Sequence, residues 1–217
     1  MNKNVSTLQR VLNVWAIVLI VWSIYRTKLS LPEWFDELVA KPLVFVLPVY
    51  YSIKHFEQKP FFQQIWLKKK TILTDTYTGV FVGLIFLVAA FFSNYIRLGN
   101  VSFLEDVLST NLVIAGILTL ATAISEEILS RGFILKRLYE ESSNMYSSSF
   151  IASTLFLVLH IPILFTIPNL SGSLLLLFLA TDFILSLVNS FIFLDRKSLL
   201  APILIHAFYN FAILFYT

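Results

Sequence analysis

The sequence predicts an all-α membrane protein with about seven transmembrane helices. Of its 217 residues, 58% are hydrophobic and only 13% are charged, whereas roughly 25% of residues are charged in a soluble domain. The mean hydropathy is +0.81. The apolar residues form stretches too long for strands, without the alternation typical of a membrane β-barrel.

Seven segments are long and apolar enough to cross a bilayer, or nearly so. The second carries Pro42 and Pro48 and is the shortest, so a re-entrant segment is an alternative there. Arg26, Thr27 and Lys28 follow the first segment in place of a small-residue cleavage pattern, which indicates an uncleaved span. The segments are 11–25, 41–53, 76–96, 107–128, 149–167, 173–194 and 199–216.

The chain shows no internal repeat and no domain boundary. We therefore expect one integrated membrane domain, with N-terminal membrane helices over 1–105 and a helical core over 106–217 that carries the polar motifs. The fourth helix is predicted to continue past Glu126 to Lys136. Residues 142–144 and 147–149, which are serines and one asparagine, are predicted to form a polar connection and the N-cap of the fifth helix.

Basic residues predict the orientation. With a cytoplasmic N-terminus, twelve Lys and Arg residues fall on the cytoplasmic side and four on the other, in agreement with the positive-inside rule. The cytoplasmic set includes Arg131, Lys136 and Arg137, and the outer set includes Lys41. Seven spans then place the C-terminus outside.

Composition also excludes several chemistries. The chain has no cysteine, so disulfides, thiolate metal sites and thiol nucleophiles are ruled out. A net charge of +3 gives no reason to expect a nucleic-acid partner. The lipid bilayer is the first expected partner.

Titratable residues inside the apolar segments are the candidate functional groups, because charge is costly in lipid. Glu126 and Glu127 lie near the end of the fourth segment, and two of the three histidines, His160 and His206, lie within the fifth and seventh. Counted at 1.5 Å per residue, Glu126 lies about 15 Å from Lys136, and His160 about 16 Å from the start of its helix. His206 lies about 12 Å, and Asn210 about 18 Å, from the start of the seventh segment. These groups should share one layer of the membrane.

Helical spacing assigns partners within this set. Arg131 is four residues from Glu127 and should pair with it, whereas Glu126 points about 100° away towards another partner. His206 and Asn210 are also four apart, so both can donate hydrogen bonds to a developing oxyanion. Glu126 and His160 could hold and deprotonate a water. The set is a plausible hydrolytic site that needs no Ser or Cys nucleophile.

Three motifs occur in order: EExxxR at Glu126, Glu127 and Arg131; FxxxH at Phe156 and His160; HxxxN at His206 and Asn210. Over residues 111–217 this pattern resembles the CaaX-protease and bacteriocin-processing (CPBP, or Abi) family of intramembrane endopeptidases.

The resemblance implies a conical catalytic cavity within the bilayer, open towards the cytoplasm, and a peptide or membrane protein as substrate. It assigns water activation to Glu126 and His160, and oxyanion stabilisation to His206 and Asn210. Glu127, Arg131 and Phe156 would support these groups.

A zinc-bound mechanism has also been considered for the family, and Glu126, His160 and His206 could supply its ligands. The chain lacks an HExxH helix, so we favour glutamic-type chemistry and expect no cofactor. Family members are linked to bacteriocin self-immunity and peptide maturation. A short chain rich in Phe, Ile and Lys favours the plasma membrane of a bacterium.

Non-catalytic interpretations remain open. The two glutamates and Arg131 could form an interfacial charge cluster, and His160 could bond a backbone carbonyl near Pro162. His206, Asn210 and Asn189 could be interhelical hydrogen-bonding groups, and a structural role is the first expectation for Asp182. The whole chain could then be a membrane scaffold, a regulator or an immunity protein that keeps the fold.

Overall fold

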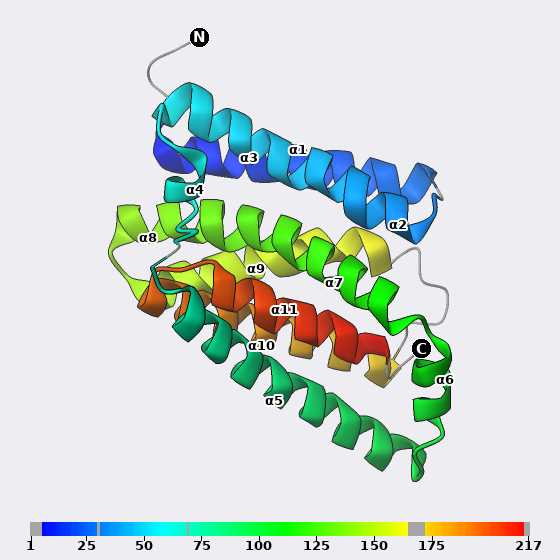
Figure 1. Cartoon of the computed structure of the whole chain (residues 1–217). Helices are drawn as coiled ribbons and strands as arrows, with labels where there is room; N and C mark the ends of the chain where they lie inside the picture. The colour runs from blue at the N-terminus through cyan, green and yellow to red at the C-terminus, as the bar shows by residue number, and fades with distance from the viewer. Residues whose placement is uncertain (1–5, 30, 69, 165–171, 215–217) are drawn as a thin grey trace.

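The computed structural model describes residues 6–29, 31–68, 70–164 and 172–214. Every regular element in these residues is helical, which confirms the predicted all-α class (Figure 1). In Figure 1, α1 (Thr7–Lys28) and the segment that follows it lie on one side of α7 (Leu112–Glu127) and α9 (Met145–Leu164). On the other side lie α5 (Ile72–Leu98), α10 (Gly172–Arg196) and α11 (Leu200–Ile213).

Among the described residues, five helices have the length and hydropathy needed to cross a membrane. The chain is thus an integral membrane protein, but the predicted count of seven spans is not confirmed. The second predicted span fails the criterion, and the seventh corresponds to α11, an apolar helix of only 14 residues. The five spans are Thr7–Lys28, Ile72–Leu98, Leu112–Ser142, Met145–Pro162 and Leu175–Arg196.

The second predicted segment is longer than 41–53 and is an unbroken run of α- and π-helical turns that returns along α1 (Figure 1). Pro42 is the first residue of η2, and Pro48 is the second residue of α3. Because proline has no backbone N–H, each removes one α-helical hydrogen bond, which favours a change of register there. The elements are α2 (Glu33–Phe35), η1 (Asp36–Ala40), η2 (Pro42–Val46), α3 (Leu47–Ser52) and η3 (Ile53–Glu57). A short α4 (Phe61–Gln64) then leads to α5.

The start of the fourth predicted span was wrong. Residues 103–109 form a separate helix, α6 (Phe103–Ser109), and α7 begins only at Leu112 because the Asn111 side chain accepts a hydrogen bond from the Ile114 amide. The predicted continuation past Glu126 is correct. The π-helical η4 (Ile128–Leu135) and α8 (Lys136–Ser142) follow α7 without a break.

Of the two polar stretches predicted to connect and cap the fifth helix, the first supplies the cap. The Asn144 carboxamide accepts a hydrogen bond from the Ser147 amide, so α9 begins at Met145 and the serines at 147–149 lie inside it. The predicted ends of the fifth and seventh segments, at 165–167 and 215–216, lie outside the described residues. Residues 1–5 also lie outside them.

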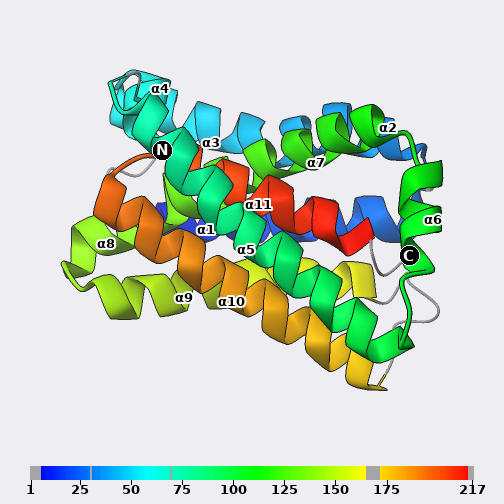
Figure 2. The same cartoon turned by 60° about the horizontal axis from the view of Figure 1, so that its bottom comes forward.

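Two glycines let α5 lie close against α11, as Figures 1 and 2 both show. A Cβ atom added to Gly79 would meet the Leu204 Cβ at 2.7 Å, and one added to Gly83 would meet the Phe208 ring at 2.6 Å. Small residues four apart are a usual means of close helix packing in membranes. This contact matters for function because α11 carries His206.

We expect Gly83→Val to destabilise the α5–α11 contact by about 1–3 kcal/mol, the usual cost of overpacking a well-packed interface. Thermal unfolding in detergent would show a lowered midpoint. Gly116→Val is the matched control, because a Cβ added to Gly116 would meet nothing within 4 Å. Equal midpoints for the two variants would contradict this account of the packing.

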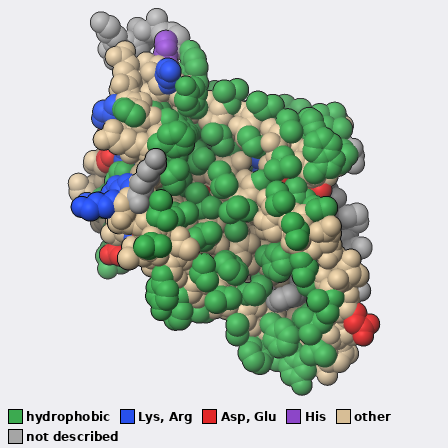
Figure 3. Space-filling model, in the orientation of Figure 1, with side chains coloured by type: hydrophobic (Ala, Val, Ile, Leu, Met, Phe, Trp, Pro, Cys, Tyr) green, Lys and Arg blue, Asp and Glu red, His purple; other side chains and the backbone are tan. Residues whose placement is uncertain are grey.

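The surface fits a bilayer environment, since apolar side chains cover most of the face in Figure 3. Basic side chains gather at the end that holds α4 and α8 (left in Figure 3). Five exposed lysines lie in the described segments at this end: Lys54, Lys59, Lys68, Lys70 and Lys197.

The charge count used to predict the orientation needs correction. Lys41, Arg131, Lys136 and Arg137 are all buried in helices rather than exposed in loops, and each makes an ion pair. The pairs of Lys41 with Glu126 and of Arg137 with Glu57 join separate helical segments. Lys3 and Lys69 lie outside the described residues. The cytoplasmic N-terminus therefore stays a prediction, now based on fewer residues.

Candidate active site

The fold brings Glu126, His160 and His206 together from three helices, α7, α9 and α11. The Oε2 atom of Glu126 lies 3.6 Å from Nε2 of His160 and 3.6 Å from Nε2 of His206. Glu126 is only 5% exposed. Its Oε2 is buried and makes no hydrogen bond within the described part of the chain. One acceptor and two ring nitrogens thus converge on a small volume.

Glu127 faces a different set of partners, as the helical spacing predicts. Its Oε1 accepts hydrogen bonds from Arg131 at 2.7 Å and from the Asn189 amide at 3.1 Å. The same oxygen lies 2.8 Å from Nδ1 of His206. A carboxylate only accepts, so Nδ1 of His206 carries the proton and Nε2 is turned towards Glu126.

His160 is oriented in a comparable way. Its Nδ1 lies 3.0 Å from the Phe156 carbonyl oxygen and 3.6 Å from Oδ2 of Asp182. The backbone hydrogen bond matches the one considered for a merely structural histidine, although its acceptor is Phe156 rather than the carbonyl next to Pro162. It places the proton on Nδ1 and leaves Nε2 free to accept one.

Arg131 and Phe156 support the two histidines. The guanidinium of Arg131 is 1% exposed and also donates to the Ser186 carbonyl and hydroxyl, at 3.1 and 2.7 Å. It stacks over the Phe156 ring at 4.6 Å, while that ring contacts His160 at 4.6 Å and His206 at 5.7 Å between centroids. Phe156 therefore packs against the arginine and both histidine rings.

Among the described residues, no hydrogen bond joins the Asn210 side chain to this cluster. It lies half-buried on α11, one turn beyond His206, and its side chain makes no hydrogen bond with another described residue. Asn189, by contrast, bridges Glu127 and the Pro202 carbonyl, in agreement with its expected role as an interhelical hydrogen-bonding residue.

Sequence reasoning missed Lys41, which it counted as an outer-loop charge. Its Nζ lies 2.8 Å from Oε1 of Glu126 and 2.7 Å from Oε2 of Glu37. Glu37 also accepts a hydrogen bond from Thr122, one turn before Glu126 on α7. The signal was available: Glu37 and Lys41 are four apart beside an apolar stretch, the kind of pair that marks a site in a membrane protein.

A small cavity of about 70 Å³ adjoins these groups. Its volume suits water or a narrow part of a substrate, not a whole peptide. Its lining comprises Trp22, Arg26, Glu37, Lys41, Phe45, Glu126, Leu159 and His160.

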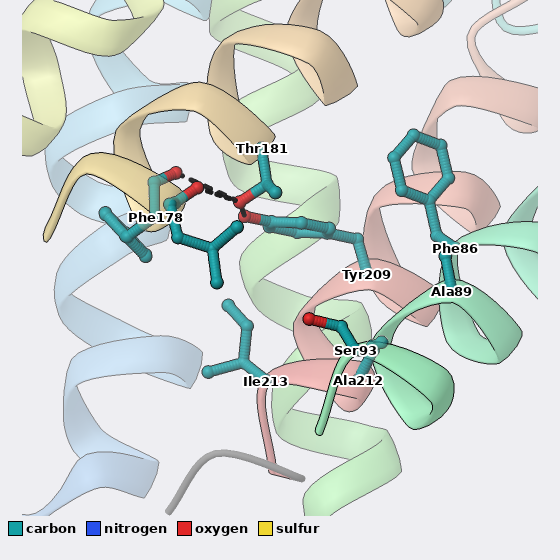
Figure 4. A pocket seen from close by; sticks show the side chains of 10 residues that line it. Phe86, Ala89, Ser93, Phe178, Thr181, Tyr209, Ala212 and Ile213 are labelled. Atoms are coloured by element: carbon teal, nitrogen blue, oxygen red, sulfur yellow. Dashed lines mark hydrogen bonds between the residues drawn. The ribbon is translucent and has the colours of Figure 1, made fainter. Parts of the chain in front are cut away.

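A larger cavity of about 340 Å³ lies between α5, α10 and α11. Its described lining is mostly apolar and includes none of the predicted site residues, although the hydroxyls of Thr181 and Tyr209 meet there at 3.0 Å (Figure 4). A search for the active site by cavity volume alone would therefore have selected this cavity and missed the titratable cluster.

Metal ligation was the alternative use of Glu126, His160 and His206. Across the described residues, no group of three or more His, Cys, Asp or Glu side chains is placed to hold a metal ion. The nitrogen and oxygen donors of the three residues suit zinc chemically. A chelator experiment is therefore needed to distinguish glutamic-type from zinc-dependent hydrolysis.

The family model described as "Type II CAAX prenyl endopeptidase Rce1-like" matches residues 108–212. Residues 108–212 are thus similar to the CAAX protease family. This confirms the resemblance carried by the three motifs, and the matched region contains all seven of the site residues named from the sequence. The family is one of membrane proteases. Searches of curated proteins and of solved structures found no match.

Proposed function

We propose that the chain is an intramembrane endopeptidase that hydrolyses a peptide bond with water activated by Glu126 and His160. One observation carries the proposal: Oε2 of Glu126 and the Nε2 atoms of both histidines converge in a buried layer of the bundle. A buried, unbonded carboxylate oxygen beside two imidazoles is a suitable place to bind and deprotonate water. We further propose that the protein resides in a bacterial plasma membrane, with its N-terminus in the cytoplasm.

The reaction follows from the orientation of these groups. Water attacks the carbonyl carbon, and its proton passes to Glu126 or to Nε2 of His160. The oxyanion that forms is held by hydrogen bonds from His206, in its protonated form, and from Asn210. The proton returned to the amide nitrogen lets the C–N bond break. Since Asn210 has no partner among the described residues, its carboxamide is free to turn towards a bound substrate.

The substrate must offer an extended segment, because the peptide groups of a helix are already hydrogen-bonded and the cavity beside Glu126 is narrow. A CAAX-type peptide or the end of a membrane protein meets this condition. Bacteriocin self-immunity and peptide maturation are proposed physiological settings, and this assignment rests on the family alone.

Comparative peptidomics of cells that carry the wild-type chain or Glu126→Gln tests the proposal. Peptides that depend on the wild-type chain, and that share a cleavage position, would support an endopeptidase and identify its substrates. Identical peptide profiles, together with a preserved biological effect of the variant, would instead favour a membrane scaffold, regulator or immunity protein.

Chelator treatment separates the two mechanisms. With glutamic-type chemistry, purified protein should keep its activity after treatment with a strong zinc chelator, and elemental analysis should find less than stoichiometric zinc. Loss of activity that added zinc restores would establish the zinc alternative, with Glu126, His160 and His206 as its ligands.

A further inference from the structure

Lys41 binds the proposed general base from outside the family-matched region. It lies at the junction of η1 and η2, in the N-terminal half of the chain, whereas the match begins at residue 108. Its ammonium group lies 2.8 Å from Oε1 of Glu126, which is the oxygen that does not face the histidines. The two oxygens of this carboxylate thus have separate roles.

The lysine is itself held in place. Its side chain is 9% exposed, and Glu37 binds it from one turn earlier in the same segment. Thr122 on α7 in turn binds Glu37, so the contact spans both halves of the chain. The Lys41 Nζ also lies 5.8 Å from the centre of the Trp22 ring on α1. An ammonium group restrained by residues of three elements, η1, α7 and α1, has little freedom to leave Glu126.

Charge balance gives a second reason for this contact. The guanidinium of Arg131 is used by Glu127 and Ser186, so it does not bind Glu126. A buried carboxylate needs a paired cation nearby. Of the lysines and arginines whose ion pairs are described, Lys41 is the one that contacts Glu126.

We propose that Lys41 is a positioning residue for the reaction. It binds Oε1 of Glu126, fixes the rotation of the carboxylate, and thereby presents Oε2 to the water between the two histidines. This inference rests on the proposed function, since it gives Lys41 a role only through Glu126. It also explains what the N-terminal half contributes to a site whose motifs all lie in the C-terminal half.

Steady-state kinetics of Lys41→Met, Lys41→Arg and wild type, in detergent or liposomes, test this role on a peptide found to be cleaved by wild type. Lys41→Met should lower kcat by about 10²-fold, the cost expected for a misplaced catalytic group, with little change in KM. Lys41→Arg keeps the charge and should recover much of kcat. All rates are normalised to folded protein measured by size-exclusion chromatography.

Lys136→Met is the matched control. Lys136 is also a buried lysine, 3% exposed, with hydrogen bonds to Gln64 and an ion pair to Glu140. It lies about 15 Å along the same continuous helix from Glu126. Its loss should lower the stability of the protein without a comparable loss of kcat per folded molecule.

The outcomes are distinct. Wild-type kcat in Lys41→Met, or equal losses in Lys41→Met and Lys136→Met, would overturn the positioning role while leaving the proposed function intact. A rise in KM alone would assign Lys41 to substrate binding and would also overturn the positioning role.

If Lys41→Met does not fold, Lys41→Gln takes its place, because the glutamine amide is neutral but can still donate a hydrogen bond. Failure of the function itself would show as an absence of cleavage by wild type.

Discussion

Glu126→Gln should reduce turnover by about 10²–10⁴-fold, the range expected when a general base is removed. The carboxamide has nearly the shape of the carboxylate, but its nitrogen cannot accept a proton from water. The buried Oε2 that faces both histidines would be replaced by a neutral group. Cleavage of a defined peptide by purified protein, followed by mass spectrometry, measures the loss.

The matched control for this variant is Glu141→Gln, a carboxylate on the exposed end of the same continuous helix. It should cleave at the wild-type rate. Because Lys41 loses a charged partner in Glu126→Gln, the variant must also be shown to remain folded and inserted. Undiminished turnover in folded Glu126→Gln would rule out Glu126 as the base. The non-catalytic interpretations of the chain would then be favoured.

Sequence spacing predicted much of the site because helix geometry is regular. Depths counted along three separate helices placed Glu126, His160 and His206 in one layer, and the 100° turn per residue separated Glu126 from Glu127. In the structure, these side chains meet and the Glu127–Arg131 pair forms. Such predictions need only the period of a helix and the cost of charge in lipid.

Contacts between helices that are distant in the sequence could not be predicted from helical spacing. Lys41 reaches Glu126 because the segment 33–57 packs beside α7 and changes register through π-helical turns. Neither the packing partner nor the register of such turns follows from local sequence. The side-chain direction of Asn210 also depends on packing, which is why its spacing from His206 did not guarantee a contact.

The same limit applies to the division at residue 105. The predicted border between N-terminal helices and a C-terminal core lies close to the start of the family match at 108. Even so, two ion pairs join the two regions, the N-terminal helices and the C-terminal core, one between Lys41 and Glu126 and the other between Glu57 and Arg137. The organisation as one integrated membrane domain stays a prediction.

Arg131→Met should destabilise the protein by about 3–5 kcal/mol, the range found when one partner of a buried ion pair is removed. The change leaves the Glu127 carboxylate fully buried, with its Oε2 already lacking a hydrogen bond within the described residues. It also removes the donors to Ser186 on α10 and the stacking contact with Phe156. Thermal or denaturant unfolding in a fixed detergent measures the effect.

A double variant separates the charge from the packing. Glu127→Gln with Arg131→Met removes both charges, so it should recover part of the lost stability, because a neutral pair avoids the unpaired buried carboxylate. Lys70→Met, at an exposed position, should change the stability by less than about 0.5 kcal/mol. If the double variant were no more stable than Arg131→Met, the arginine would act through its contacts with Phe156 and Ser186 rather than as the counter-charge of Glu127. His206 would then owe its orientation to packing as much as to the carboxylate beside it.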